Sequence, residues 1–340
     1  MIRPRPSRVS LAAAALALAW PAATLRAQAH PRRGPIEWRE EWLLAQPRLT
    51  LPATRPDLLP PGRLQLRVDL DWGNDFGWRQ NVAGESPDDR RFLVDGEHRS
   101  LSVGLRAGLT RRLEVEARLP VRWRGGGLMD GVIDWVHGLG FPDNGRGFFL
   151  RDQLRVRGRD ESFLPLVWQG GSGTGLGNLE LALRGALLRR EASGWALSGV
   201  ARAALPTGSG TFAGGGVEVG VQLVGAHPLG TAFDAYFGLG GTYYTDVELQ
   251  GVAYARSRAH GFAALEWRPG GRWSLLLQLE AAGRLVEAVA EYPGFQSYLR
   301  IGALFEVSEG WTLEGGFSEG LSHQQATTDF GIGIGLRREF

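Results

Sequence analysis

Two carboxylates and an imidazole at helical spacing form the clearest chemistry-bearing group in this sequence. Asp130, Asp134 and His137 stand at i, i+4 and i+7, which places them on one side of a short helix. Such groups are ligands for hard or borderline cations, although three ligands spread along one helical face often lie too far apart to share an ion. The opposite face is apolar, which favours a simpler interpretation, an amphipathic helix that caps or enters the mouth of a larger structure. That face carries Met129, Val132, Ile133 and Val136.

Two other groups contain residue types that could bind phosphate or catalyse acyl transfer, but the surrounding sequence does not fit either kind of site. Alternating glycines from 171 to 177 resemble a phosphate-binding loop, but such a loop needs a helix N-terminus after it, and here a strand is expected. Histidines and serines occur without a spacing motif for acyl transfer. We therefore predict no catalytic residue, metal or cofactor, and keep a lipid-modifying enzyme as an alternative. The histidines and serines considered for acyl transfer are His98, His260, His323, Ser102, Ser257 and Ser322.

The N-terminus has the pattern of a cleaved export signal. Arg3, Arg5 and Arg8 precede an apolar stretch at 9–20 that is too short to span a bilayer, and Ala27-Gln28-Ala29 resembles a cleavage site. Residues 1–29 contain four arginines and no acidic residue, so the formal charge of +2 becomes −2 once they are removed. Nucleic-acid binding then has no support from charge. The chain has no cysteine, which excludes disulfides and thiolate sites.

After a Pro-rich segment at 30–61, predicted as a periplasmic lead-in outside the sheet, polar and apolar residues alternate with period two. In one segment Leu113, Val115 and Ala117 alternate with Glu114 and Glu116. Twelve segments of this kind occur, each of about 9–11 residues, which matches tilted membrane strands. The sequence therefore predicts an all-β protein, a transmembrane antiparallel up-and-down β-barrel of about 12 strands over 62–340, of the outer-membrane type.

The connections between these segments alternate in length. Short ones (110–112, 188–194, 227–231, 268–271 and 308–310) follow even strands, and longer ones (73–91, 125–173, 206–215, 244–256, 283–294 and 320–328) follow odd strands. Short turns on one rim and long loops on the other are typical of outer-membrane barrels. The longest, at about 125–173, is predicted to be an external loop.

The alternation also assigns side chains to the two faces of the wall. Charged residues at the inward positions are predicted to line the lumen: Arg67, Asp69, Glu114, Glu116, Arg118, Arg122, Arg184, Arg202, Glu218, Glu266, Glu280, Arg300 and Glu314. Tryptophans near strand ends predict two aromatic belts at the membrane interfaces: Trp72, Trp123, Trp195, Trp267, Trp273 and Trp311. The terminal Phe340 resembles the insertion signal read by the barrel-assembly machinery, and outer-membrane lipid is the other expected partner.

Several motifs resemble the outer-membrane barrel family catalogued as domain of unknown function 3187. They include Trp72-Gly-Asn-Asp-Phe76, Val94-Asp-Gly-Glu97, the loop from Gly127 through Asp130, Asp134 and His137 to Arg146, and Gly175-Leu-Gly-Asn178. The resemblance covers most of the chain after the signal peptide. It implies an outer-membrane barrel but no particular substrate or activity.

Together these observations predict a protein of the outer membrane that acts as a narrow channel or small-molecule uptake component. The mixed arginine and glutamate lumen would set its selectivity, and the 125–173 loop would gate it. The substrate is not indicated by any motif. A lipid-modifying enzyme, and a structural or surface-interaction barrel without transport, are the alternatives.

Overall fold

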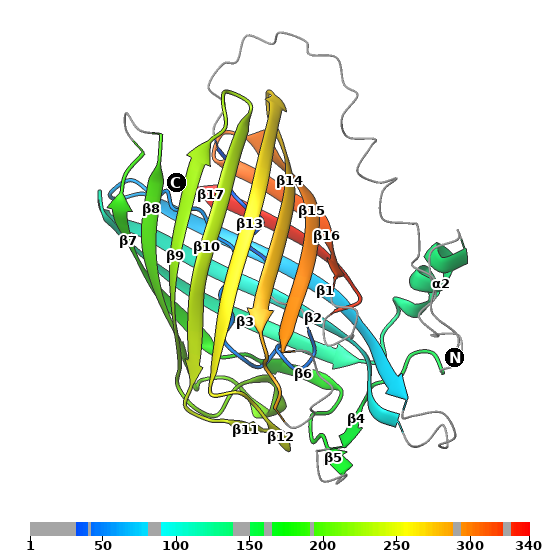
Figure 1. Ribbon diagram of the computed structural model, residues 1–340. Coiled ribbons are helices and arrows are strands. Elements are labelled where there is room, and N and C mark those ends of the chain that lie inside the picture. Colours follow the sequence, from blue (N-terminus) through cyan, green and yellow to red (C-terminus); the bar gives the residue numbers. More distant parts are fainter. Residues whose placement is uncertain are drawn as a thin grey trace, which may run out of the picture.

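The computed structural model describes residues 32–39, 42–80, 90–138, 150–159, 165–190, 194–287, 294–321 and 328–340. The predicted signal peptide at 1–29 lies outside the described residues. Within these ranges twelve long antiparallel strands close into a barrel (Figure 1). They are β1 (Leu64–Gln80), β2 (Arg90–Thr110), β3 (Leu113–Gly125), β7 (Leu179–Leu188), β8 (Ala196–Leu205), β9 (Glu218–Pro228), β10 (Phe233–Tyr244), β13 (Ser257–Gly270), β14 (Trp273–Gly283), β15 (Phe295–Ser308), β16 (Trp311–Gly320) and β17 (Phe330–Glu339).

The first and last strands pair with each other and close the sheet. Ten residue pairs join β1 to β17, from Gln65 opposite Glu339 to Asn74 opposite Phe330. Closure leaves the barrel strands without an unpaired edge, which a sheet in lipid requires because no water is there to bond free backbone groups. The predicted 12-stranded outer-membrane fold is confirmed.

The two faces of the wall have opposite chemistry. Along β3 buried and less buried residues alternate without a break, and the buried set includes Glu114, Glu116 and Arg118. Leucine and valine side chains on the other face stay exposed, among them Leu105 and Leu183, each 49% accessible. Charge inside and hydrocarbon outside is the reverse of a soluble protein and suits a wall surrounded by lipid.

Short and long connections lie at opposite ends of the barrel, named the short-turn end and the long-loop end. The strands reach further toward the long-loop end than the sequence pattern indicated. In the connection predicted at 73–91 the described residues, 73–80 and 90–91, are strand, because β1 continues to Gln80 and β2 begins at Arg90, with Trp78 still opposite Leu93. The period-two pattern weakens there, where the wall leaves the expected lipid zone and both faces carry polar groups.

The segment between β3 and β7 contains one helix and three short strands. Helix α2 (Asp130–Gly138) is followed by β4 (Arg155–Arg159), β5 (Pro165–Val167) and β6 (Gly173–Leu176). Strand β4 extends the sheet beside β2, and β6 pairs with β3. Further along the chain come the 3-10 turn η2 (Gly210–Phe212) and the small hairpin of β11 (Glu248–Leu249) and β12 (Val252–Ala253). No helix among the described residues is long and apolar enough to cross a membrane.

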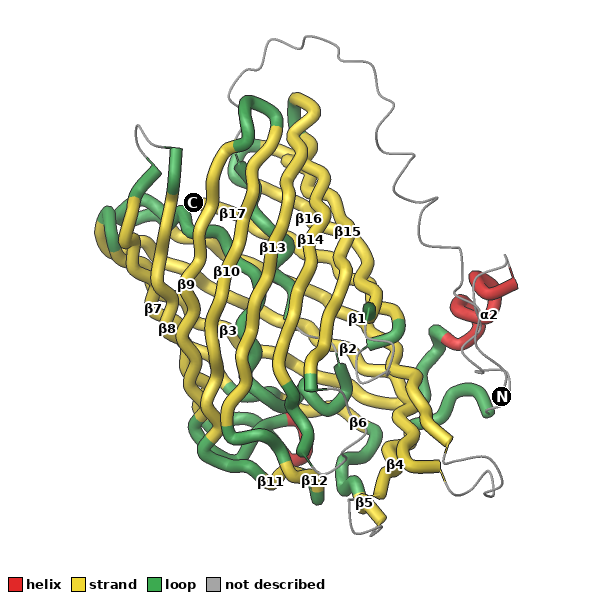
Figure 2. Tube along the Cα trace, viewed as in Figure 1, coloured by secondary structure: helices red, strands yellow, loops and turns green. Residues whose placement is uncertain are grey.

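Helix α2 lies beside the barrel and not in its mouth (Figures 1 and 2). The backbone N–H of Met129 donates to the carboxylate of Glu97, and Asn74 donates to Asp130 (Nδ2 to Oδ1, 3.4 Å). Glu97 and Asn74 both occupy outward positions on β2 and β1. The predicted position of this helix in the mouth is therefore wrong, because its polar first turn is held by the outer face of the wall.

Candidate functional site: the occupied lumen

Residues 32–39 and 42–61, together named the lumenal segment, lie inside the barrel. Its side chains are largely buried, including Ile36, Trp38 and Arg48 at 0–1% accessible. In Figure 2 the segment is a non-strand tube surrounded by the strands of the barrel. The prolines do keep it out of the sheet, as expected, but its position corrects the prediction of a periplasmic lead-in. Its polar groups find their partners on the inward faces of the strands.

The segment has two limbs and a tip. The rising limb, residues 32–39, starts at the short-turn end, where Arg33 donates to the Gly271 carbonyl (3.4 Å) in the β13–β14 turn. The tip, residues 42–49, lies at the long-loop end. The returning limb, residues 50–61, comes back to the short-turn end, where the N–H of Gly62 donates to the Gly108 carbonyl (2.8 Å) just before β1 begins. The segment thus occupies the lumen twice before the chain enters the wall.

The rising limb is fitted to the wall by backbone bonds and by glycines. Gln278 of β14 both accepts from the N–H of Ile36 (2.9 Å) and donates to its carbonyl (3.0 Å). The indole of Trp38 lies against Gly333 of β17, where any Cβ would come within 2.3 Å of the ring. A glycine at this inward position is therefore required by the close approach of the tryptophan.

Glu37 is the centre of a buried ion-pair network. Its carboxylate lies 2.6 Å from Arg106 Nη2 and 3.5 Å from Arg67 Nη1, and it accepts from the Thr54 hydroxyl of the returning limb (2.9 Å). Burial alone would raise the pKa of Glu37, but the guanidinium groups of Arg106, Arg67 and Arg184 hold that pKa well below its usual range. Glu37 is therefore ionised near neutral pH, and its carboxylate joins both limbs to the wall.

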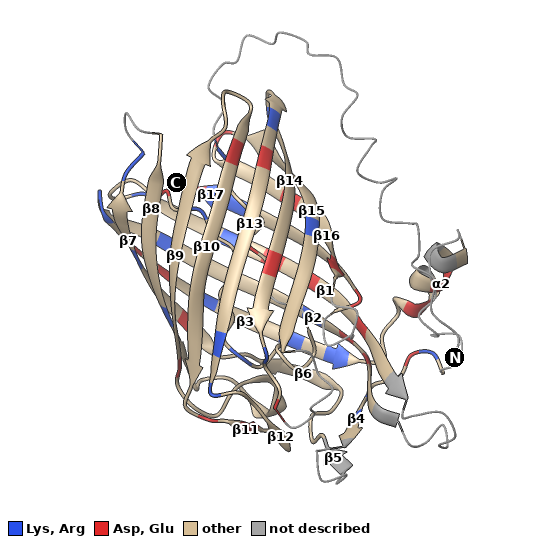
Figure 3. Ribbon diagram, viewed as in Figure 1, with Lys and Arg blue, Asp and Glu red and all other residues tan. Residues whose placement is uncertain are grey.

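The network continues around the wall. Arg106 also reaches Glu116 (3.1 Å), which pairs in turn with Arg202 (3.3 Å). Arg67 bridges Asp69 (2.7 Å) and Glu314 (3.1 Å). Charged positions in Figure 3 accordingly occur along the strands as well as in the loops. Buried charges are costly unless paired, and this pairing makes a filled, charged interior possible.

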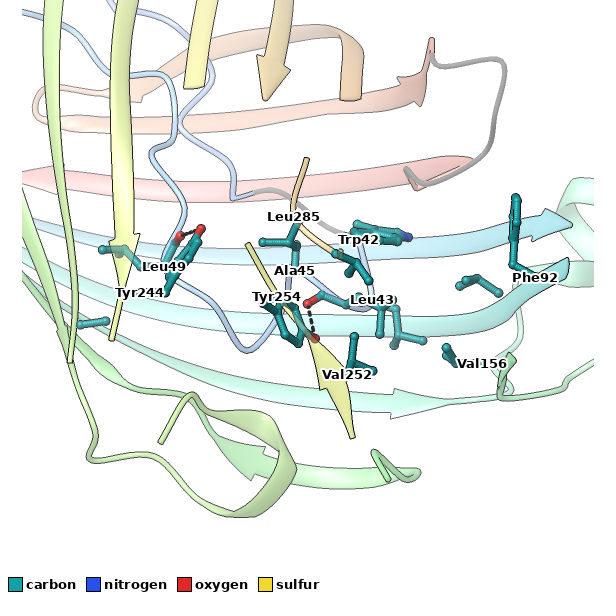
Figure 4. Packing of buried hydrophobic residues seen from close by; sticks show 14 residues of the cluster. Trp42, Leu43, Ala45, Leu49, Phe92, Val156, Tyr244, Val252, Tyr254 and Leu285 are labelled. Carbon is teal, nitrogen blue, oxygen red and sulfur yellow. Dashed lines mark hydrogen bonds between the residues drawn. The ribbon is translucent and has the colours of Figure 1, made fainter. Parts of the chain in front are cut away.

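The tip of the lumenal segment closes the long-loop end with an apolar cluster (Figure 4). Members of the cluster come from the tip, from β2, from β4 and from the later strands and loops: Trp42, Leu43, Leu44, Ala45, Leu49, Phe92, Val94, Val156, Ala204, Tyr244, Val252, Tyr254, Leu285 and Val286. Leu154 and Trp168 of the predicted 125–173 loop pack against it. That loop therefore contributes to the closed end through its second half.

Arg48 fixes the tip by charge and by aromatic contact. Its guanidinium pairs with Glu218 of β9 (2.7 Å) and lies 4.3 Å from the ring centre of Tyr254 and 5.2 Å from that of Tyr244. Both tyrosine hydroxyls donate to tip carbonyls, at Leu44 and Leu49 (3.1 Å each). Burial raises the pKa of Tyr254 to about 12 despite the nearby Arg48 and Arg124, so this hydroxyl stays a donor.

The predicted lumen-facing residues all lie on the inside of the wall. All are buried except Glu280, which is partly accessible and pairs with Arg300 (3.1 Å). Five of them bind the backbone of the lumenal segment directly. Glu114, Glu266 and Glu218 accept from the N–H groups of Leu59 (2.6 Å), Arg33 (3.0 Å) and Leu49. Arg184 and Arg300 donate to the carbonyls of Arg55 and Arg39.

Several inward residues with the same role are missing from the predicted set. They include Arg106, which binds Glu37, Asp234, which pairs with Arg32 (2.6 Å), and Arg337, which donates to the Arg33 carbonyl. The alternation of polar and apolar residues places them on the inward face of each strand, and this pattern could have identified them from the sequence.

The predicted belt tryptophans lie on the outer face. Trp195 stacks on His227 (4.2 Å between ring centres), Trp273 lies against Phe305 (4.4 Å), and Trp267 stacks on Phe233 (6.3 Å), all toward the short-turn end. Trp311 contacts Arg338 (4.8 Å), whose guanidinium also lies 4.4 Å from the Phe340 ring. Toward the long-loop end, Trp72 lies under Arg99 (4.3 Å). Trp123 faces Arg99 across β2 and β3.

The predicted loop ligands are not brought together as a metal site among the described residues. Asp130 accepts from Asn74 and from the N–H of Asp152 (2.7 Å), while Asp134 pairs with Arg151. The side chain of His137 lies outside the described residues. Within the described ranges no group of three or more His, Asp and Glu is arranged to hold a metal.

The histidines considered for acyl transfer face the lumen where their side chains are described. His98 Nδ1 lies 3.4 Å from Asp75, and His260 Nε2 lies 3.1 Å from the Thr242 hydroxyl. His323 falls outside the described residues.

Comparison with known families agrees with this architecture. The family model for "Protein of unknown function (DUF3187)" matches residues 14–340. The chain belongs to this family. The resemblance predicted from the sequence motifs is thereby confirmed, and the occupied lumen is a structural feature of this DUF3187 member. No curated protein matches the sequence.

Several solved structures are similar to this barrel. An outer membrane channel from Pseudomonas putida F1 has a TM-score of 0.58 and 14% identity over 86% of this chain and 100% of its own. The NanC porin has a TM-score of 0.46 and 6% identity, covering 81% of this chain and 98% of its own. The P. putida toluene transporter TodX has a TM-score of 0.44 and 11% identity, covering 83% and 91%. At 14% identity the first likeness establishes the fold, that of an outer-membrane barrel.

Proposed function

We propose that this protein is an outer-membrane channel for small molecules that is closed at rest by its own lumenal segment. The observation that supports the proposal is the double passage of the lumenal segment, residues 32–39 and 42–61, through the barrel, where Glu37 anchors one part of it and Arg48 the other. The short turns would face the periplasm and the long loops the exterior, as in other barrels of this type. Lipid would contact the outward leucine and valine side chains.

The contacts between the lumenal segment and the wall are of a kind that allows the segment to move, so it need not block the lumen permanently. The segment is held mainly by ion pairs and hydrogen bonds, which water can replace one for one when the segment shifts. Its larger apolar cluster lies at the tip, where Trp42 and Tyr254 exclude water from the long-loop end, and a smaller cluster joins Ile36 and Trp38 to the wall. Trp168, of the 125–173 loop, adds to this cluster, so we assign that loop a secondary role in gating.

Transport rather than catalysis is the proposed activity. The barrel shares its fold with the outer membrane channel from P. putida F1, and a fold with a lumen suits passage of a solute. His98 and His260, the described histidines of the acyl-transfer group, point into the filled lumen, away from lipid. A lipid substrate at the rim would not reach them.

Conductance of the purified, refolded full chain in planar bilayers tests the proposal. We expect the wild type to be mostly closed, with brief openings. A variant that weakens both anchors, Glu37→Gln with Arg48→Gln, is expected to raise the open fraction by at least about tenfold, the effect of roughly 1.4 kcal/mol. Trp168→Ala should raise it less. Correct folding of each variant is checked by heat-modifiable electrophoretic mobility.

The control is Glu309→Gln with Arg272→Gln, which changes the same residue types in exposed short turns. If the folded wild type and the anchor variant both conduct no more than an empty bilayer, the channel proposal fails. If the control pair opens the barrel as much as the anchor pair, the lumenal segment is not the gate.

A further inference from the structure

A cleft remains open at the short-turn end, between the returning limb and the wall. It has a volume of about 420 Å³. One side is formed by residues 56–61 of the returning limb, and the other by the β2–β3 turn, the end of β7 and the start of β8. A volume of this size lies within the range of small-molecule binding sites in proteins.

The walls of the cleft combine hydrocarbon with guanidinium groups. Leu58, Leu59 and Leu188 supply apolar surface, together with prolines and alanines of the same segments. Three arginines also line it, against a single carboxylate, that of Asp57; they are Arg111, Arg189 and Arg190. The balance of charge therefore favours an anion, and the apolar surface favours a ligand with a hydrocarbon part.

Only one of the three arginines is committed elsewhere among the described residues. Arg190 lies 3.5 Å from Asp57 and 3.3 Å from Asp234, and it donates to the Gly194 carbonyl (3.1 Å). Arg111 and Arg189 are exposed and have no ion pair within the described ranges. Two guanidinium groups are thus available at the opening, behind which the apolar walls begin.

We propose that this cleft binds a small amphiphilic anion, with its carboxylate or phosphate between Arg111 and Arg189 and its apolar part against Leu59 and Leu188. Planar guanidinium groups suit both kinds of oxyanion because they form paired, charge-assisted hydrogen bonds. The ligand would contact the returning limb directly. Binding itself does not require transport, so the inference stands or falls separately from the channel function.

Calorimetric titration of the full chain in a neutral detergent tests this inference. The probe is phenylbutyrate, and the comparison ligands are phenylbutanol, which lacks the charge, and inorganic phosphate, which lacks the apolar part. We expect saturable binding of phenylbutyrate and at least about tenfold weaker binding of each comparison ligand, in line with one lost charge-assisted bond or one lost apolar contact surface.

Three variants assign the binding to the cleft. Arg111→Gln with Arg189→Gln is expected to weaken phenylbutyrate binding about tenfold or more and to leave phenylbutanol unaffected. Asp57→Asn should strengthen it, because it removes the opposing charge and releases Arg190. Arg272→Gln, at the β13–β14 turn away from the cleft, should change nothing. Absence of saturable binding, or an equal loss with Arg272→Gln, would overturn the inference.

The natural ligand could be a free amphiphile or the headgroup of an anionic lipid, and a competition experiment separates the two. The titration is repeated in nanodiscs of phosphatidylcholine with and without phosphatidylglycerol. Displacement of phenylbutyrate by phosphatidylglycerol, lost in the Arg111→Gln/Arg189→Gln variant, assigns the cleft to lipid headgroups. Undiminished binding in both membranes assigns it to free amphiphiles.

Discussion

The carboxylate of Glu37 lies 2.6 Å from the guanidinium of Arg106, and this pair joins the lumenal segment to strand β2 in the interior of the barrel. Both side chains are buried, and the second oxygen of Glu37 is held by Thr54 of the other limb. One carboxylate therefore connects three parts of the chain that are separated in sequence.

Replacement of Glu37 by Gln is expected to loosen the segment. Removing one partner of a buried pair leaves Arg106 and Arg67 without full compensation, which typically costs about 3–5 kcal/mol. We expect a lower midpoint in denaturant unfolding and faster trypsin cleavage within residues 32–39. Glu309→Gln, on the exposed β15–β16 turn, serves as the control, and an equal effect of the two substitutions would show that Glu37 is not an anchor.

Acid should open the barrel through the same residue. Because the pKa of Glu37 in the folded protein is lower than the value of about 4.3 for a free glutamate, the unfolded chain binds more protons than the folded one between these two values. The stabilisation by Glu37 is therefore complete above about pH 4.3 and is lost as the pH falls through the depressed pKa.

Conductance recorded from about pH 7 down to about pH 3 checks this expectation. The wild type should stay closed over the upper part of the range and open only in its most acidic part. Glu37→Gln should lack this component of the acid response. An identical acid response in the variant would assign it to other carboxylates.

Arg48→Lys should weaken the closed end while keeping its charge. Lysine can still pair with Glu218, but it loses the planar stacking on Tyr254 and Tyr244 that guanidinium provides, which is worth about 1–2 kcal/mol when buried. We expect more frequent openings in single-channel records. Arg272→Lys on an exposed turn is the matched control, and unchanged gating in Arg48→Lys would show that charge alone holds the tip.

A single methyl group at position 333 should displace Trp38. In Gly333→Ala the new Cβ would lie 2.3 Å from the indole, so the ring must move, at a cost of about 1–3 kcal/mol. Gly199→Ala on β8 is the control, because nothing lies within 4 Å of its Cβ position. The change in Trp38 environment can be followed by near-ultraviolet circular dichroism. Equal spectra for the two variants would contradict the observed contact.

The wall of this protein is determined by local sequence. Alternation such as Leu113-Glu114-Val115-Glu116 specifies a strand and assigns each side chain to a face, because successive residues of a strand point to opposite sides. For the same reason, the alternation along the strand is enough to place Glu116 and Arg202 on the lumenal face. The number of strands and the two kinds of rim follow from the turns, which are also short-range features.

The contents of the barrel were decided only by the tertiary structure. The prolines of residues 30–61 exclude a strand but do not say where the segment goes, since its partners, such as Glu218 for Arg48, stand 170 positions away in the chain. Helix α2 likewise has an apolar face that suits a barrel mouth, yet Glu97 and Asn74 hold its first turn outside the wall. Such pairings depend on which side chains closure of the barrel brings together, and no local pattern encodes that.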